Sequence, residues 1–177
     1  MTRPIRAAAL LVALGLALCG CYTSPALLLD PVAARQPIAS GEFESTDGSV
    51  RRLTTLPDGW YSEQIRKPGG EWGPSGRVLA NSLGHVGGRD VYVVAEYNEE
   101  VHRYVYVLAA VERDQFTLAS PDCAQRRDAA LAKVWGARRE TGKDLSDTCA
   151  FPSGRALKAA LRAFAARAAF EAPYHRR

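Results

Sequence analysis

From Gly41 to Ala119 the sequence alternates short runs of β-forming residues with turn signals at a regular spacing. Asp47-Gly48 and Pro57-Asp58-Gly59 favour tight turns, because glycine accepts a positive φ and proline presets its own φ for a bend. Such a chain folds into successive hairpins, so the sequence predicts an antiparallel β meander, either an open curved sheet or a small barrel. The predicted strands cover residues 42–46, 49–56, 60–66, 77–82, 91–97, 101–112 and 115–119.

The segment 101–112 is apolar on both of its alternating faces. Val105 and Val107 share one face, and Tyr106 and Leu108 share the other, because side chains alternate across a strand. A strand of this kind is normally covered on both sides. It is therefore expected at the centre of the sheet.

Two helices are predicted after Pro121. Asp122 is placed to cap a helix over residues 124–135 that ends at Gly136. Ser153 caps a second, amphipathic helix over residues 154–171, and residues 137–148 form a polar loop between the two. The predicted fold class is α+β: an antiparallel β meander followed by two C-terminal helices, in one β-rich domain over residues 41–177.

The N-terminus has the pattern of a secretory signal peptide. Arg3 and Arg6 form a basic start, and an apolar run follows from Ala7 to Leu18. The run reaches only about 15 residues even when extended to Cys21, whereas a helix that spans a bilayer needs about 20. Residues 1–20 are therefore expected to be a removed signal peptide, and an uncleaved anchor is the weaker alternative.

The end of this run, Leu18-Cys19-Gly20-Cys21, resembles the lipobox of bacterial lipoproteins, in which a small residue precedes the cysteine that accepts lipid. Gly20 fills that place before Cys21, whereas Leu18 would fill it before Cys19, so Cys21 is the expected acceptor. The resemblance implies a diacylglyceryl group on the thiol and a further chain, such as palmitate, on the new N-terminus. Two or three chains hold a protein on a membrane. An ordinary cleaved signal without lipid is the alternative.

The residues after Cys21 bear on where the protein is sorted. In Gram-negative lipoproteins an aspartate in the next position favours the inner membrane, and here that residue is Tyr22. The resemblance therefore implies the outer membrane, facing the periplasm. Residues 21–40 contain three prolines and are expected to form the lipidated N-terminus and a tether. Packing of the apolar patch Leu27–Leu29 on the domain would shorten that tether.

Once Cys19 is removed and Cys21 is acylated, Cys123 and Cys149 remain as a pair. The periplasm permits disulfides, so these two are expected to be bonded. A redox-active dithiol is disfavoured because there is no C-x-x-C motif, and no further Cys or His stands at the spacing of a zinc site. No metal and no cofactor is expected.

The layout of the chain also resembles uncharacterised bacterial lipoproteins that carry a β-rich domain before a C-terminal helix. The likeness rests on Pro121-Asp122-Cys123 after the last strand and Cys149-Ala150-Phe151 before the helix. It implies no known reaction. The expected function is that of a lipid-anchored, non-enzymatic envelope lipoprotein that binds a partner protein, a lipid or a small ligand.

Charge gives little support for nucleic-acid binding. Loss of Arg3 and Arg6 with the signal peptide lowers the net charge from +4 to about +2. The second helix has a cationic face, from Arg155 to Arg167, and the chain ends in His175-Arg176-Arg177. These charges are expected to be solvated, and contact with anionic lipid headgroups is the alternative. The aromatic residues of the β region suggest a concave apolar surface as an alternative to ordinary core packing.

The alternative function is a periplasmic hydrolase with its site near His85. This histidine stands in a glycine-rich segment with Asp90 close by, as in a base and its orienting acid. No G-x-S-x-G motif accompanies it. Glu96, Glu99 and Glu100 cluster near a hairpin end, where a solvated turn is expected rather than acid–base chemistry. No catalytic residue is therefore assigned.

Overall fold

The predicted hairpins form a continuous antiparallel meander. The computed structural model describes residues 21–141 and 147–177, so the predicted signal peptide, with Leu18, Cys19 and Gly20, lies outside the described residues. Each meander strand pairs antiparallel with the next along the chain. The strands are β2 (Gly41–Glu44), β3 (Val50–Thr55), β4 (Tyr61–Arg66), β5 (Gly76–Val86), β6 (Arg89–Asn98), β7 (Arg103–Glu112) and β8 (Gln115–Ala119).

The turn chemistry confirms the first two predicted turns. Gly48 and Gly59 both have positive φ, at 82° and 84°, as these turns require. The glycine-rich segment 84–90 differs from the prediction, because β5 continues to Val86 past a bulge between Ser82 and Gly84. Only Gly87-Gly88 forms the turn, since two consecutive positive φ angles match the twist of a hairpin.

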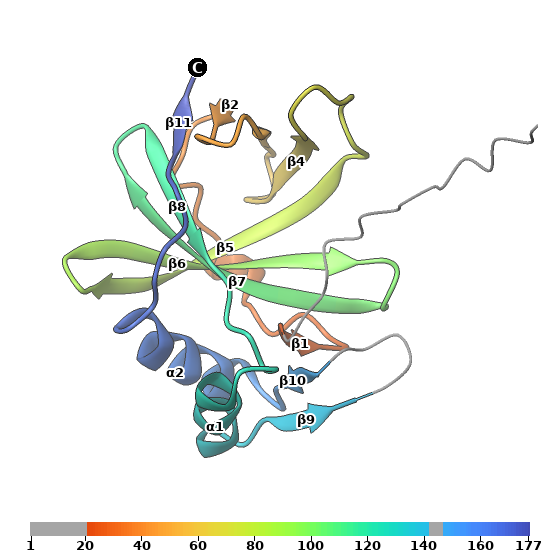
Figure 1. Ribbon diagram of the computed structural model, residues 1–177, viewed down its shortest axis with the longest axis vertical. Helices are drawn as coiled ribbons and strands as arrows, with labels where there is room; N and C mark the ends of the chain where they lie inside the picture. The colour runs from red at the N-terminus through yellow and green to blue at the C-terminus, as the bar shows by residue number, and fades with distance from the viewer. Residues whose placement is uncertain (1–20, 142–146) are drawn as a thin grey trace, which may run out of the picture.

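The meander closes into an eight-stranded barrel rather than an open sheet (Figure 1). The eighth strand is β11 (Tyr174–Arg176), which lies between β2 and β8 and pairs antiparallel with both. The tail, which was a candidate for lipid contact, is therefore part of the barrel wall. Closure removes the open sheet edges that β2 and β8 would otherwise present.

A small side sheet branches from the barrel at β7. The part of β7 from Tyr104 to Tyr106 pairs with β1 (Tyr22–Ser24), while the part from Leu108 onward pairs with β8. Strand β1 runs parallel to β10 (Thr148–Ala150), which pairs antiparallel with β9 (Arg138–Glu140). The parallel pair and β9 were not predicted, because each of these strands has three residues, too few to show an alternating pattern.

Residues 22–40 belong to the folded domain, so the expected tether is wrong for them. Tyr22, Thr23 and Ser24 are buried in β1. After a 3-10 turn, η1 (Pro31–Ala33), the buried Ile38 covers one end of the barrel, and its backbone N–H and carbonyl both bond to the Tyr61 hydroxyl. The alternative, packing of the patch 27–29 on the domain, is the one observed, with Leu29 buried and its two neighbours half-buried.

Two helices follow the meander as predicted, α1 (Arg126–Val134) and α2 (Gly154–Ala165). The Ser153 hydroxyl caps α2 by accepting a hydrogen bond from the Ala156 N–H at 3.3 Å. The predicted Asp122 cap is wrong, because its carboxylate accepts from Ala124 in a turn before the helix, and Gln125 is the N-cap. Helix α2 ends before residue 171 because the chain must return to the barrel to form β11.

The apolar residues form two cores on opposite sides of β5–β7. The outer face of these strands packs against the helices, β1 and β10, with residues such as Leu79, Val93, Leu108, Leu157 and Leu161. The barrel interior holds a second core, with Phe43, Leu53, Tyr61, Val78, Phe116 and Tyr174. Strand β7 is therefore covered on both faces, as its pattern predicted.

Gly154→Ala is expected to lower the free energy of unfolding by about 1–3 kcal/mol, the usual cost of overpacking. A Cβ at Gly154 would lie 2.2 Å from the Leu28 carbonyl oxygen. The clash could be relieved only by a shift of the backbone, because no flexible side chain is involved. Urea unfolding measures the change. Gly70→Ala is the control, because its nearest contact would be an ordinary 3.4 Å. Equal effects of the two substitutions would contradict the close approach of residues 26–29 to α2.

Candidate functional site

The expected lipid acceptor, Cys21, lies at the point where the chain enters the fold. Its carbonyl oxygen accepts a hydrogen bond from the Cys149 N–H at 3.2 Å, and the residue is partly exposed. The next residue, Tyr22, is fully buried and packs on Phe151 with ring centroids 4.8 Å apart. Cys21 is therefore bonded directly to a residue of the core.

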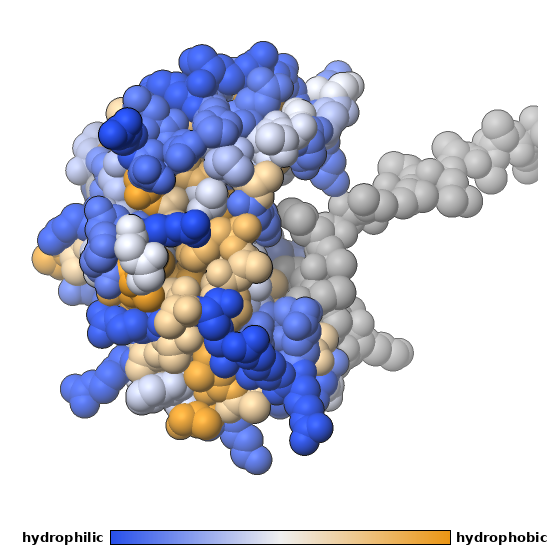
Figure 2. Space-filling model, turned by 60° about the vertical axis from the view of Figure 1, so that its left-hand side comes forward, coloured by the Kyte–Doolittle hydropathy of each residue, from blue (hydrophilic) through white to orange (hydrophobic). Residues whose placement is uncertain are grey.

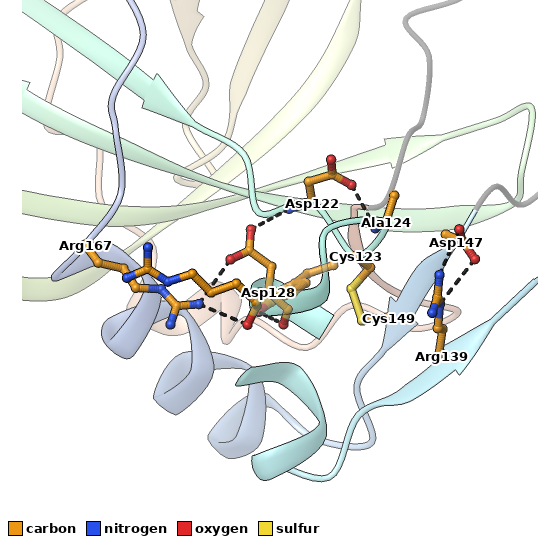
Figure 3. The surroundings of a disulfide bond; sticks show 10 residues. Asp122, Cys123, Ala124, Asp128, Arg139, Asp147, Cys149 and Arg167 are labelled. Carbon is orange, nitrogen blue, oxygen red and sulfur yellow. Dashed lines mark hydrogen bonds and ion pairs between the residues drawn. A yellow bond between two sulfur atoms is a disulfide. The ribbon is translucent and has the colours of Figure 1, made fainter. Parts of the chain in front are cut away.

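Tyr22 also joins β1 to a polar junction under α1. Its hydroxyl donates to the Asp128 carbonyl oxygen at 3.1 Å, and burial, with the nearby Asp128 carboxylate, raises the pKa of the phenol. That carboxylate accepts hydrogen bonds from the Asp122 N–H and the Arg167 guanidinium, each at 3.0 Å (Figure 3). The junction fixes the start of the folded chain against both helices.

The predicted disulfide between Cys123 and Cys149 is present (Figure 3). Its Cα atoms are 5.8 Å apart, within the usual range for such bonds, and both residues are buried. It links the segment before α1 to β10. Because β10 pairs directly with β1, the bond lies next to the entry point at Cys21.

His85 and Asp90 face each other across the β5–β6 hairpin. His85 Nδ1 lies 3.0 Å from Asp90 Oδ1, but the side chains are 66% and 69% exposed. The nearby Ser82 hydroxyl accepts from the Gly84 N–H. Within residues 21–141 and 147–177 no hydroxyl hydrogen bond joins the pair, so the contact supplies a base and an acid without a positioned nucleophile.

The three glutamates near residue 98 do not form a group. Glu99 and Glu100 are exposed in the turn, where the Asn98 side chain accepts from the Glu100 N–H at 2.9 Å. Glu96 instead lies opposite Val78 at the barrel mouth, where desolvation and the Glu63 carboxylate raise its pKa. Glu63 itself is held by Arg51 in an ion pair of 2.8 Å. Glu63 is the charged residue of this set that lines the barrel interior.

The barrel interior holds a cavity of about 60 Å³. Its lining is mainly apolar and includes Tyr61 and Tyr92 from the aromatic set. Pockets that enclose drug-sized ligands are typically about 300–1,000 Å³. The interior thus has room for very small molecules, and the aromatic residues serve mostly as core.

The predicted cationic face of α2 is largely engaged inside the protein. Lys158 donates to the Asn81 side chain, Arg162 to the Leu83 carbonyl and Arg167 to Asp128. In the tail, Arg176 donates to two backbone carbonyls, those of Ala39 and Ser40. A separate cluster of exposed cations lies on α1 and β9, a segment predicted as a helix and a polar loop.

The described residues contain neither a metal-binding cluster nor a membrane-spanning helix. In residues 21–141 and 147–177 no group of three or more Cys, His, Asp or Glu side chains is arranged to hold a metal ion. Over the same residues, no helix has the length and apolar character needed to cross a membrane. No protein-family model, curated protein or solved structure matches this sequence.

Proposed function

We propose that this chain is a lipoprotein of the bacterial cell envelope, anchored by acyl chains on Cys21. Its barrel domain is non-enzymatic and binds a partner protein or a lipid, on the outer membrane facing the periplasm. The observation that carries the proposal is the position of Cys21, one residue before a fully buried side chain. An anchor there attaches directly to the fold and holds the domain against the membrane.

The disulfide supports export to an oxidising compartment. Bonds of this kind persist in the periplasm and are rare in the bacterial cytosol. Cys123 and Cys149 are paired, which leaves Cys21 as the thiol at the entry point of the fold. A bonded pair and a separate cysteine at residue 21 are what the lipobox assignment requires.

The dimensions of the barrel favour a binding partner on the outer surface. The interior cavity, of about 60 Å³, is too small for a lipid chain. A lipid would therefore contact the outer surface of the barrel. The hydrolase alternative is supported by one contact, between His85 and Asp90, and the high exposure of both side chains weighs against it.

The test is metabolic labelling of the full chain with an alkyne analogue of palmitate in a Gram-negative bacterium. Cys21→Ala is expected to lower protein-bound label at least tenfold and to release the protein from the membrane fraction, because the thiol carries the anchor. Cys19→Ala is the matched control and should keep both label and membrane association.

Density separation of the two membranes then tests the location. We expect wild-type protein in the outer-membrane fractions. Label that persists in Cys21→Ala, or that is lost in Cys19→Ala, would contradict the assignment of the acceptor.

A further inference from the structure

An open groove of about 890 Å³ lies between α1 and β9, beside the disulfide. Four alanines and Cys149 form its small, apolar floor, and Arg126, Lys133, Arg138 and Arg139 project around it. Its volume falls within the range of ligand pockets, and no acidic side chain lines it. The shape and chemistry fit an anionic group attached to an apolar body.

The positive charge of this groove is largely uncompensated. The acids of α1 and β9 are engaged, since Asp128 pairs with Arg167 and Glu140 pairs with Arg103. Arg139 is paired with an acid, Asp147, at 2.9 Å (Figure 3).

The other three groove cations, Arg126, Lys133 and Arg138, are exposed to solvent. Over residues 21–141 and 147–177 they form no ion pair. They are therefore available to a ligand.

The groove lies close to the anchor position. Cys149, in its floor, donates its N–H to the Cys21 carbonyl, and Arg139 is the partner of Cys149 on the next strand. Neighbouring strands are about 4.8 Å apart, so Arg139 lies two strand spacings from β1. Acyl chains on Cys21 would hold the groove at the level of the lipid headgroups.

Apolar side chains flank the groove at the end of α1. The exposed fraction of Val134 is 76%, and that of Trp135 is 42%. Figure 2 shows apolar groups exposed among hydrophilic ones at the lower end of the molecule, the height at which α1 lies in Figure 1. Tryptophan next to cations is typical of a membrane interface, because its ring is amphipathic.

We propose that the α1–β9 groove binds the headgroup of an anionic glycerophospholipid in the membrane that holds the anchor. The phosphate contacts Arg126, Lys133 and Arg138, while Trp135 and Val134 contact the region below the headgroups. This assignment rests on the proposed function, which brings the groove to the membrane. A Lys or Arg near an anionic surface strengthens binding by about fivefold.

The test is native mass spectrometry of the full chain, extracted in detergent and titrated with short-chain phosphatidylglycerol or phosphatidylcholine. Wild-type protein is expected to bind one phosphatidylglycerol at least tenfold more tightly than phosphatidylcholine. The double variant Arg126→Gln/Arg138→Gln should lose this preference. Arg113→Gln/Arg155→Gln removes the same charge from two exposed positions outside the groove lining and should keep it.

The outcomes separate the two proposals. The intact mass reports acylation independently, so unacylated protein that still prefers phosphatidylglycerol would contradict the anchor and support the groove. Acylated protein without the preference, or equal losses in both double variants, would overturn the groove assignment. Displacement of the lipid by an equal concentration of inorganic phosphate would also overturn it, because the site would then recognise free phosphate.

Discussion

Tyr174→Ala is expected to lower the free energy of unfolding by about 3–5 kcal/mol, as removal of a buried aromatic side chain does. Tyr174 begins β11, the strand that closes the barrel. Its ring stacks on Phe116 with centroids 5.1 Å apart, and the Arg51 guanidinium lies 5.2 Å from the ring centre. The substitution removes the apolar contact that holds β11 between β2 and β8.

The matched control is His175→Ala, on the same strand. His175 is exposed, so its removal should change stability by less than about 0.5 kcal/mol. Urea unfolding measures both variants, and amide hydrogen exchange should show faster exchange in β2 and β8 for Tyr174→Ala alone. Similar, small losses for the two variants would contradict the role of β11 in closing the barrel.

Removal of the disulfide is expected to lower the free energy of unfolding by about 3–4 kcal/mol. The bond closes a loop with a sequence separation of 26, and this figure follows from the chain-entropy model for a loop of that length. The double variant Cys123→Ala/Cys149→Ala should therefore unfold at clearly lower urea. Because β10 pairs with β1, exchange protection should fall first in residues 21–24 and 148–151.

Reductant provides the control for this substitution. Reduced wild-type protein should resemble the double variant, and the variant itself should not respond to reductant. Mass spectrometry confirms the state of the thiols. Wild-type protein that keeps its stability with both thiols reduced would show that packing alone holds β10 and β1 together.

Features that depend on neighbouring residues could be predicted from the sequence. The turns at Gly48 and Gly59 follow from local backbone preferences, and the cap at Ser153 follows from its hydroxyl. The double coverage of β7 follows from its two apolar faces. The disulfide followed from the assignment of Cys21, which left one pair.

The candidate groove could not be predicted in this way. Arg126 and Lys133 lie two helical turns apart on α1, a spacing that indicates a shared face, but Arg138 and Arg139 appeared to lie in a loop. Their position opposite α1 depends on β9 pairing with β10. That pairing joins three-residue strands, whose sequences carry too little pattern to be recognised.

The hairpin order, the two helices and the pair of cysteines could all be read from the sequence, because each depends on contacts between near neighbours or on a count. Tertiary structure decided the closure of the barrel by Tyr174–Arg176, the burial of Tyr22 beside Cys21, and which cations remain exposed. Several of these contacts join segments far apart in the sequence, such as Tyr22 and Asp128 with a separation of 106. Their partners are selected by the packing of the whole chain, and no local pattern encodes that choice.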